Sequence, residues 1–347
     1  MNPLVSINLV VYNEEKRIRD CLKAVFNQTY KNYEVLVFDN NSSDKTLEIV
    51  RNDFPRAKFF KADKNYSFGP GQNRAAKMTS GKYILGLCAD VWIKEDFLEK
   101  AVEIMEQNPK IGALQAKIYQ LAPFATQNNT EQTQNNAELK IKTNIIDTAG
   151  FEIYKSRRIV NRGHGIKDTG QFSKEEEIFS YEGACPFWRR GALEDSAVWG
   201  EYHDEDYFWY GDDIDLGWRM HLLGWKNYFT PQVIAWHERQ TTKRTSKSRW
   251  DFIGQRKSLP KNKKMLDWVN LRLTFVKNDL GIFRWPDIYK FLNREIQLFV
   301  YSLIFEPYTI FVGLPRFIRY LPRALKKRKE IMRRKKVSTK EIKRWYK

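Results

Sequence analysis

The sequence predicts an α/β protein with a Rossmann-like, mixed and mostly parallel sheet flanked by helices, followed by a helical C-terminal extension. Apolar strand-like runs alternate with amphipathic helical segments over the first half of the chain. Acidic residues follow directly after several of those runs. Beyond about residue 240 the strand signals stop, and apolar segments lead into a basic end. We therefore expect a sheet domain over residues 1–240 and a helical region over residues 241–347.

The N-terminal elements repeat a strand–helix order. Residues 5–12 form an apolar run, and the following residues open a helix with Ile18, Cys21, Leu22 and Val25 on one face. Further strands are expected over residues 33–38, 59–60 and 82–87, with a helix over residues 45–52 and a glycine-rich loop over residues 67–76 leading into another. This alternation predicts parallel strands joined by crossover helices.

Two acids follow these strands. Asp39 comes directly after the second strand, and Asp90 follows the strand over residues 82–87. The carboxyl ends of parallel strands meet at one edge, where such sheets bind ligands. The loop over residues 67–76 could present a helix N-terminus to a phosphate there. Alternatively it only turns the chain, because its glycines lack the dinucleotide-binding spacing.

A second acidic group, formed by Asp212, Asp213 and Asp215, follows Gly211 in the first turn of a predicted helix. The helix should close at Gly224, and strands over residues 225–229 and 233–236, separated by a turn at Thr230-Pro231, should end on His237. The acids either only cap the helix or join His237 at a pocket.

Between the two acidic groups, residues 123–137 are rich in Asn, Gln and Thr and predict a surface loop, either a lid or a tolerated insertion. A hairpin is expected over residues 147–160, and residues 181–185 should enter a strand over residues 187–189. Glycine in that segment would let a ligand approach the backbone closely. Nearby aromatic residues that could stack on a ligand, or that fill the core, are Trp188, Trp199 and Tyr202.

Composition limits the partners and the compartment. The net charge is +18, and the aromatic content of 14% includes 11 Trp, which suits a membrane interface or a carbohydrate as well as nucleic acid. No recognisable nucleic-acid-binding motif accompanies the charge, so we expect no nucleic acid partner. The three cysteines form no CxxC pair, and no signal peptide is recognisable, so we expect the cytosol.

The C-terminal region carries two membrane signals. Residues 298–314 are strongly apolar but are interrupted by Glu306-Pro307 and followed by Pro315, which favours a pair of in-plane helices over a membrane span. Residues 326–347 then contain twelve Lys or Arg against two Glu. Together these features predict peripheral attachment to an anionic membrane surface. The alternative is a solvated tail after a small helical subdomain.

In order and spacing, several motifs together resemble the family 2 glycosyltransferases of the GT-A fold, and especially the bacterial rhamnosyltransferase-like members. These are VVYNEE, FDNNSSDKT, SFGPGQNRAA, LCADV, SYEGACPFWRR, and YGDDIDLGWR followed by IAWH, over about residues 5–237. The resemblance implies transfer of one sugar, with rhamnose from dTDP-rhamnose as the leading donor, to a lipid-linked glycan at the cytoplasmic face of the bacterial membrane. UDP-hexose or UDP-galactofuranose donors stay open.

The resemblance also implies residue roles. The general base is Asp213, and Asp90 with His237 binds a divalent metal, Mg²⁺ or Mn²⁺. Such an ion would stabilise the charge that develops on a leaving diphosphate, and a carboxylate can accept the acceptor's proton. The nucleotide sugar is expected at Val11, Tyr12, Asn13, Glu14, Asp39, Asn73, Arg74, Ala89 and Asp90, with Asp39 accepting from the pyrimidine. The acceptor is expected at Gly183, Ala184, Trp188 and Asp212.

Two positions depart from the family pattern. Cys88 stands where an acid or an asparagine is common, and a thiol is a soft ligand ill suited to Mg²⁺. In the glycine loop the arginine stands one place late, at Arg74, which leaves the phosphate contact open. The rival interpretation is therefore a non-catalytic membrane-surface or nucleic-acid-binding protein on a degenerate GT-A fold. The absence of a QxxRW motif argues against processive synthesis.

Overall fold

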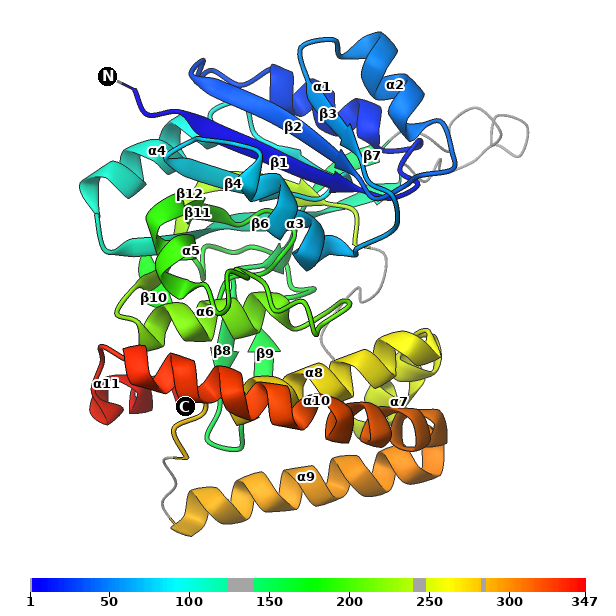
Figure 1. The fold of residues 1–347 in the computed structure, drawn as a ribbon, viewed down its shortest axis with the longest axis vertical. Coiled ribbons are helices and arrows are strands. Elements are labelled where there is room, and N and C mark those ends of the chain that lie inside the picture. Colours follow the sequence, from blue (N-terminus) through cyan, green and yellow to red (C-terminus); the bar gives the residue numbers. More distant parts are fainter. Residues whose placement is uncertain (1, 124–139, 240–247, 282–284) are drawn as a thin grey trace.

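The computed structural model describes residues 2–123, 140–239, 248–281 and 285–347. The main feature is a mixed sheet in the strand order β10-β12-β6-β11-β4-β1-β2-β3 (Figure 1). In addition, strand β5 pairs with β12, and strand β7 pairs with β6. The strands are β1 (Val5–Val11), β2 (Tyr33–Asp39), β3 (Lys58–Lys61), β4 (Tyr83–Leu87), β5 (Val91–Ile93), β6 (Ile111–Pro123), β7 (Lys140–Thr148), β8 (Phe151–Ile153), β9 (Ile159–Asn161), β10 (Glu176–Ile178), β11 (Phe187–Arg189) and β12 (Lys226–His237). The predicted α/β fold with a mixed sheet is confirmed.

The parallel half of the sheet is β4-β1-β2-β3, as the strand–helix alternation predicts. Every residue of β1 is buried, because helices cover both faces of the sheet and strands in that position read as continuous apolar runs. In register, Val11 at the end of β1 pairs with Asp39 at the end of β2. The parallel strands thus end together at one edge.

The second half of the sheet differs in one respect from the prediction. β12 is a single strand that runs through Thr230 and Pro231, where two strands separated by a turn were expected. Its pairing with β6 shifts register between Thr230 and Ile234, so Pro231 lies in a bulge. A proline without an amide proton is tolerated there because the ladder is already interrupted. The predicted hairpin is present as β8 and β9.

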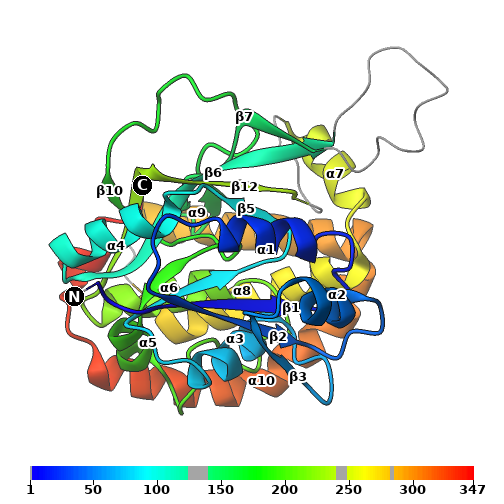
Figure 2. The ribbon, with the colours of Figure 1, turned by 90° about the horizontal axis from the view of Figure 1, so that it is seen from above.

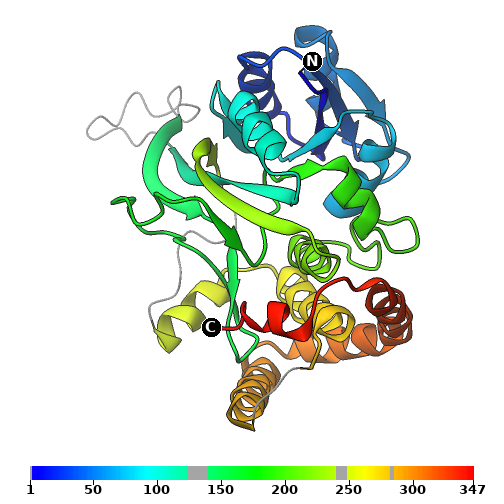
Figure 3. The same cartoon turned by 90° about the vertical axis from the view of Figure 1, so that its left-hand side faces the viewer.

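Helices cover both faces of the sheet (Figures 2 and 3). One face packs against α1 (Ile18–Phe26), α2 (Thr46–Asp53) and α4 (Phe97–Gln107), and the other against α3 (Phe68–Lys77), α5 (Arg190–Ser196) and α6 (Asp212–Leu222). Helix α3 lies so close to β1 that a Cβ on Gly71 would come 2.7 Å from Val10 Cγ1. The segment predicted as a glycine-rich loop is therefore mostly the helix α3 itself, and Gly71 allows this helix to pack closely on β1.

Beyond β12 the described chain is helical, with α7 (Arg249–Lys257), α8 (Lys261–Asn278), α9 (Trp285–Phe305), α10 (Pro307–Arg334) and α11 (Thr339–Lys343). The helical region expected over residues 241–347 was not resolved into single helices at this point, and α7 was not located. Pro315 and Pro322 lie inside α10 without ending it. None of the helices in the described part of the chain is long and apolar enough to cross a bilayer.

The helical region shares hydrophobic clusters with the sheet domain. Trp218 of α6 packs in one cluster with Ile331 and Tyr346, and Tyr207 packs in another with Leu273 and Ala324. The division at residue 240 stays a prediction, but the two parts are joined by common cores. The predicted lid over residues 123–137 lies almost wholly outside the described residues.

Candidate active site

The donor side of the site lies where β1 and β2 end. Asn13 has a positive φ of 56°, and its side-chain oxygen accepts a hydrogen bond from the Ser43 amide at 2.9 Å. The Asn13 amide in turn donates to the Ser42 hydroxyl at 2.9 Å. These two bonds hold the turn after β1 against the turn after β2. Tyr12, which lies between Val11 and Asn13 in the sequence, is exposed.

Asp39 is fully buried at the end of β2, and both its carboxylate oxygens accept from the Ser42 amide. Its predicted contact with a pyrimidine therefore requires the Ser42 turn to open. Asn40, which the sequence reasoning passed over, bridges this turn to the α3 loop, because its side chain donates to the Ser67 carbonyl at 2.9 Å and accepts from the Tyr66 amide.

Asn73 and Arg74, predicted to touch the donor, are held in protein contacts. The Asn73 side chain exchanges hydrogen bonds with the His203 backbone, both at 2.8 Å. Arg74 donates to Glu205 at 2.9 Å, and its guanidinium lies 3.8 Å from the ring centroid of Tyr66. Both residues fix the segment before α6 against α3, which explains their place in the motif without a phosphate contact.

The predicted metal pair converges. His237 Nε2 lies 3.4 Å from Asp90 Oδ2, because the end of β12 pairs with β5 beside Asp90. On its other side, His237 Nδ1 lies 2.9 Å from Asp147 Oδ2 at the end of β7. Burial lowers the pKa of His237, but the two carboxylates outweigh burial and raise the pKa to about 10. The two acids thus favour the protonated imidazole, which must release a proton before its nitrogen can bind a metal.

These donors fit a divalent metal ion. An imidazole nitrogen and a carboxylate oxygen 3.4 Å apart can face one ion. The Asp147–His237 hydrogen bond is the arrangement that fixes the tautomer and orientation of a metal-binding imidazole. No group of three or more His, Cys, Asp or Glu side chains gathers as a metal site within the described ranges. An imidazole favours Mn²⁺ over the oxygen-seeking Mg²⁺.

Cys88 is not placed as a third ligand. Burial raises the pKa of its thiol well above the ordinary value, which keeps the sulfur protonated at neutral pH. Its backbone is used instead, since the Cys88 amide donates to the Ala184 carbonyl at 2.9 Å. The departure from the family pattern at this position therefore leaves the Asp90–His237 pair intact.

Glu14 and Arg17 line the same edge. Burial raises the pKa of Glu14, while Arg17 opposes that shift and Asp90 adds to it. Arg17 pairs with Glu14 at 3.2 Å and with Glu238 at 3.0 Å. Burial raises the pKa of Asp90 as well, but the His237 cation, with help from Arg17, more than offsets this and the pKa lies below its ordinary value. The edge is acidic, as a cation site should be.

Asp213, the predicted base, lies across the segment that includes Gly183 and Ala184. The Gly183 amide donates to Asp213 Oδ2 at 3.1 Å, and the Ile214 amide donates to Oδ1 at 2.8 Å. Burial, together with the charges of Asp212 and Glu182, raises the pKa of Asp213 well above that of an ordinary carboxyl. A carboxyl with a raised pKa is a stronger base once ionised, which suits proton abstraction.

The remaining predicted acceptor residues differ in placement. Asp212 lies beside His203, with Oδ2 3.1 Å from Nδ1, and close to Gly69 at the start of α3. Trp188 is only 1% exposed and packs edge-on against Tyr181 and His203, so it is a core residue and offers no face to a sugar. Asp215, the third acid of the motif, is fully buried.

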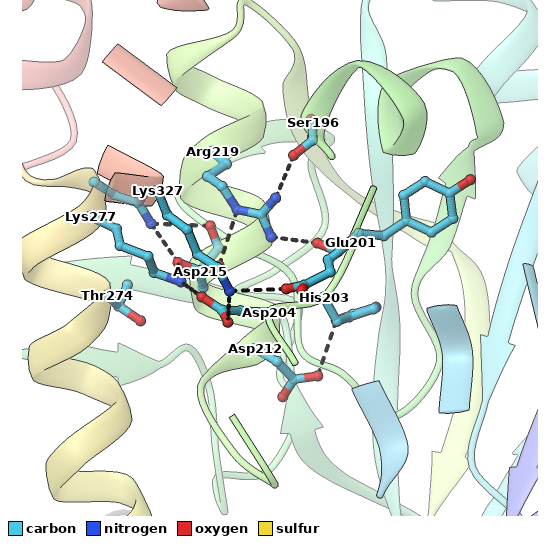
Figure 4. A network of polar contacts seen from close by, with 12 residues as sticks. Ser196, Glu201, His203, Asp204, Asp212, Asp215, Arg219, Thr274, Lys277 and Lys327 are labelled. Atoms are coloured by element: carbon cyan, nitrogen blue, oxygen red, sulfur yellow. Dashed lines mark hydrogen bonds and ion pairs between the residues drawn. The ribbon is translucent and has the colours of Figure 1, made fainter. Parts of the chain in front are cut away.

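A buried network of charged side chains lies beside α6 (Figure 4). Lys277 of α8 pairs with Asp204 and, at 2.8 Å, with Asp215, which also accepts from Arg219 at 3.1 Å. Lys327 of α10 contacts Asp204 and lies 2.9 Å from Glu201. Because these cations come from the helical region, that region fixes the helix whose first turn carries Asp212 and Asp213.

Sequence reasoning missed Asp147, Glu182 and Arg239. Arg239 donates to both carboxylate oxygens of Asp147, at 2.7 and 3.0 Å, and to Glu182 at 3.0 Å. It thereby ties the metal pair to the segment beside Asp213. Glu182 lies inside the SYEGAC motif, and a carboxylate at that position could have indicated a site residue. Asp147 lies in none of the quoted motifs, and its partners His237 and Arg239 follow about ninety residues later in the sequence.

Asp147→Asn should lower the affinity for Mn²⁺ about 10- to 100-fold, because losing the partner charge weakens a metal-binding histidine by that order. Mn²⁺ binding can be followed by electron paramagnetic resonance without turnover. Asp195→Asn, which alters an ion-paired acid on α5, is the matched control and should leave the affinity unchanged. Equal affinity in the Asp147 variant and the parent would show that His237 is not a ligand.

A cavity of about 870 Å³ opens elsewhere, beside α1 and the edge of the sheet, lined by residues that include Phe26, Phe54 and Trp236. None of the predicted site residues lines it. Cavity volume therefore does not mark this site, which is recognised by its charges.

Comparison with known proteins agrees with this geometry. The model of the family described as "Glycosyl transferase family 2" matches residues 6–195. A poly-beta-1,6-N-acetyl-D-glucosamine synthase of Staphylococcus epidermidis is 24% identical over 235 residues, which is 67% of this chain and 49% of the relative. The chain thus spans about half the length of the curated relatives it matches first.

Two solved structures share the fold. GalNAc-T7 with UDP, GalNAc and Mn²⁺ superposes with a TM-score of 0.55 at 13% identity, covering 88% of this chain and 58% of that one. The mannosyltransferase PcManGT from Pyrobaculum calidifontis, in complex with GDP-Man and Mn²⁺, gives 0.51 at 14% identity, covering 96% and 86%. The sheet is therefore of the GT-A type, and the chain belongs to glycosyltransferase family 2.

Proposed function

We propose that this protein transfers a single sugar from a nucleoside diphosphate sugar to a hydroxyl of a lipid-linked glycan, at the cytoplasmic face of a bacterial cell membrane, with inversion at the anomeric carbon. The observation that carries the proposal is the placement of two groups. A carboxyl of raised pKa, Asp213, hydrogen-bonds Gly183, and the same segment is tied through Glu182 and Arg239 to the Asp90–His237 pair.

The reaction is one displacement. The Asp213 carboxylate takes the proton of the acceptor hydroxyl while that oxygen forms a bond to the anomeric carbon of the donor sugar. The bond from that carbon to the diphosphate oxygen breaks, and its electron pair leaves with the nucleoside diphosphate. Attack from the side of Asp213, opposite the diphosphate, inverts the carbon. No covalent bond to the protein is needed.

Asp90 and His237 would hold the divalent ion, and Mn²⁺ suits this mixed oxygen and nitrogen pair. When bound, the ion supplies positive charge for the leaving diphosphate. Both fold neighbours were solved with Mn²⁺, which supports this assignment. The protein's own part is orientation, since Asp147 fixes the His237 ring and Arg239 fixes Asp147.

The donor sugar is proposed from resemblance. Motif order favours dTDP-rhamnose, and UDP-hexose and UDP-galactofuranose are the alternatives. The family's named relatives add N-acetylglucosamine, because the staphylococcal relative is a poly-N-acetylglucosamine synthase. The buried Asp39 at the end of β2 is the side chain that would distinguish a pyrimidine base by accepting its ring N–H.

The test is a panel of UDP-, dTDP- and GDP-sugars incubated with the full chain, with Mn²⁺ or with a chelator, while nucleoside diphosphate release is measured. One donor should be turned over with Mn²⁺ and not with the chelator. Asp90→Ala should abolish the metal response, and the exposed-surface variant Lys58→Ala should keep it. If no donor binds or turns over with metal, the non-catalytic interpretation replaces this one.

A further inference from the structure

The two outermost helices, α9 and α10, display apolar stripes that are exposed to solvent. On α9 the stripe is Tyr289, Leu292, Ile296, Phe299 and Leu303, with the exposed Ile304 beside it, and on α10 it is Tyr308, Phe311, Pro315, Ile318, Pro322 and Leu325. Within each stripe the spacing alternates between three and four residues, so its members share one helix face. All of these residues are exposed.

The arrangement of the helices makes these stripes accessible. Helix α9 forms the outer layer of the molecule, with α8 and α10 between it and the sheet domain (Figures 1 and 3). Several of these side chains are highly exposed to solvent: the exposed fraction is 70% for Phe311, 63% for Ile304 and 62% for Ile296. An apolar surface of this extent on a soluble protein normally marks an interaction site.

The charges around the stripes are of one sign. Across residues 286–325 the exposed charged side chains are Lys290, Arg319 and Arg323. The acids of the same range are turned inward: Asp287 is buried, Glu295 pairs with Arg272 and Arg294, both at 2.6 Å, and Glu306 pairs with Arg256 at 2.7 Å. Arg323 also pairs with Asp206 at 2.8 Å, so Lys290 and Arg319 form the basic border of the apolar stripes.

We propose that the α9–α10 face, defined by these two stripes and their basic border, is a docking surface for an anionic lipid bilayer, on which the helices lie in the plane of the interface. Apolar side chains on one face with Lys and Arg beside them are the composition of interfacial helices. Tyr289 and Tyr308 suit the headgroup level, where tyrosines gather. The proposal deepens the proposed function, because a lipid-linked acceptor is met at such a surface.

A second copy of the chain is the competing occupant, since stripes of this spacing also pack helix against helix. Two features argue against it. Pro315 and Pro322 occupy two positions of the α10 stripe, and a compact proline ring is a poor knob for a facing helix. Two identical faces would also bring basic borders together, which is repulsive, whereas an anionic lipid surface attracts both.

The basic end of the chain contributes less than its composition suggests. Lys327 is buried against Glu201 and Asp204, Lys336 pairs with Asp195 at 3.0 Å, and Arg344 pairs with Glu177. These three cations pair with acids of the sheet domain, which lowers the net charge that the basic end offers to lipid. The predicted membrane attachment therefore depends mainly on the α9–α10 face.

The test is flotation of the full chain with vesicles of phosphatidylcholine alone or mixed with phosphatidylglycerol. The parent should float with the anionic vesicles and bind them less at high salt. The triple variant Ile296→Gln, Ile304→Gln, Phe311→Gln should bind at least about a hundredfold more weakly, because each replaced side chain loses its burial in the lipid. Glutamine suits a helix and these positions are exposed, so folding should be unaffected.

The matched control replaces three exposed apolar residues elsewhere, Phe59, Met78 and Ile166, by glutamine and should float like the parent. Donor hydrolysis without vesicles should be the same in all three proteins, which separates failure of docking from failure of the proposed chemistry. Equal flotation of the triple variant and the parent would overturn the proposal. So would a parent dimer that the triple variant converts to a monomer without any vesicle binding by the parent.

Discussion

Asp213→Asn should lower the rate of sugar transfer at least about a hundredfold, because general base catalysis typically contributes a factor of about 10² to 10⁴. Asparagine keeps the shape of the side chain and can still accept from the Gly183 amide. It cannot take the proton of the acceptor hydroxyl. Donor binding, measured as the shift in thermal unfolding produced by nucleotide sugar and Mn²⁺, should stay near that of the parent.

The pH dependence of sugar transfer provides a second measurement on this variant. A raised pKa means that Asp213 stays protonated to a higher pH than an ordinary aspartic acid, whose pKa is about 3.9. Activity of the parent should therefore fall as the pH decreases through the raised pKa, and the residual activity of Asp213→Asn should lack that limb. Asp195→Asn, which alters an ion-paired acid on α5, is the matched control. Near-normal turnover of Asp213→Asn would assign the base to another group.

Lys277→Met should destabilise the protein by about 3–5 kcal/mol, the usual cost of removing one partner from a buried ion pair. Lys277 is 1% exposed between Asp204 and Asp215. Burial raises the pKa of Asp204, but Lys277 and Lys327 outweigh it and hold the pKa far below the ordinary value. Methionine fills the space but leaves both carboxylates short of a counter-charge. Urea unfolding of the parent and the variant measures the difference.

Lys23→Met is the control, because Lys23 is a largely exposed lysine whose pair with Asp20 spans 3.8 Å, and such surface pairs contribute at most about 1 kcal/mol. A second variant, Lys277→Met with Asp204→Asn, should recover part of the lost stability, since it removes one of the uncompensated charges. A Lys277→Met protein as stable as the Lys23→Met protein would show that the network is hydrated in solution and contributes little.

Most of the parallel half of the fold was predictable because β1, β2 and β4 are largely apolar runs, with Asp39 at the end of β2 and Asp90 shortly after β4. Asp39 and Asp90 therefore came to the right edge on local pattern alone. Asp147 was not predictable in this way, because its function depends on His237 and Arg239, which reach it only through the pairing of β6 with both β7 and β12.

Two further errors have physical causes. The interruption expected at Glu306-Pro307 is where α9 ends and α10 begins. Pro315 also read as an interruption, yet it lies on the exposed face of α10, where solvent can reach the carbonyl left without an amide partner. Trp188 read as a sugar platform because aromatic side chains serve both in cores and in carbohydrate sites. Its burial follows from Gly86 on the adjacent strand, where a Cβ would come 2.4 Å from the indole ring. Sequence alone does not show that contact.

The buried network of Lys277, Lys327 and Asp204 has a consequence for synthesis on the ribosome. Asp204 precedes its two lysine partners by 73 and 123 residues. At typical translation rates of about 5–20 residues per second, it is made about 4 to 25 seconds before they are. The strands β1 to β4 pair with one another within residues 5–87 and can begin to fold during this interval. The nascent chain therefore passes through a stage in which the acids of this network are hydrated and exposed to chaperones until α8 and α10 arrive.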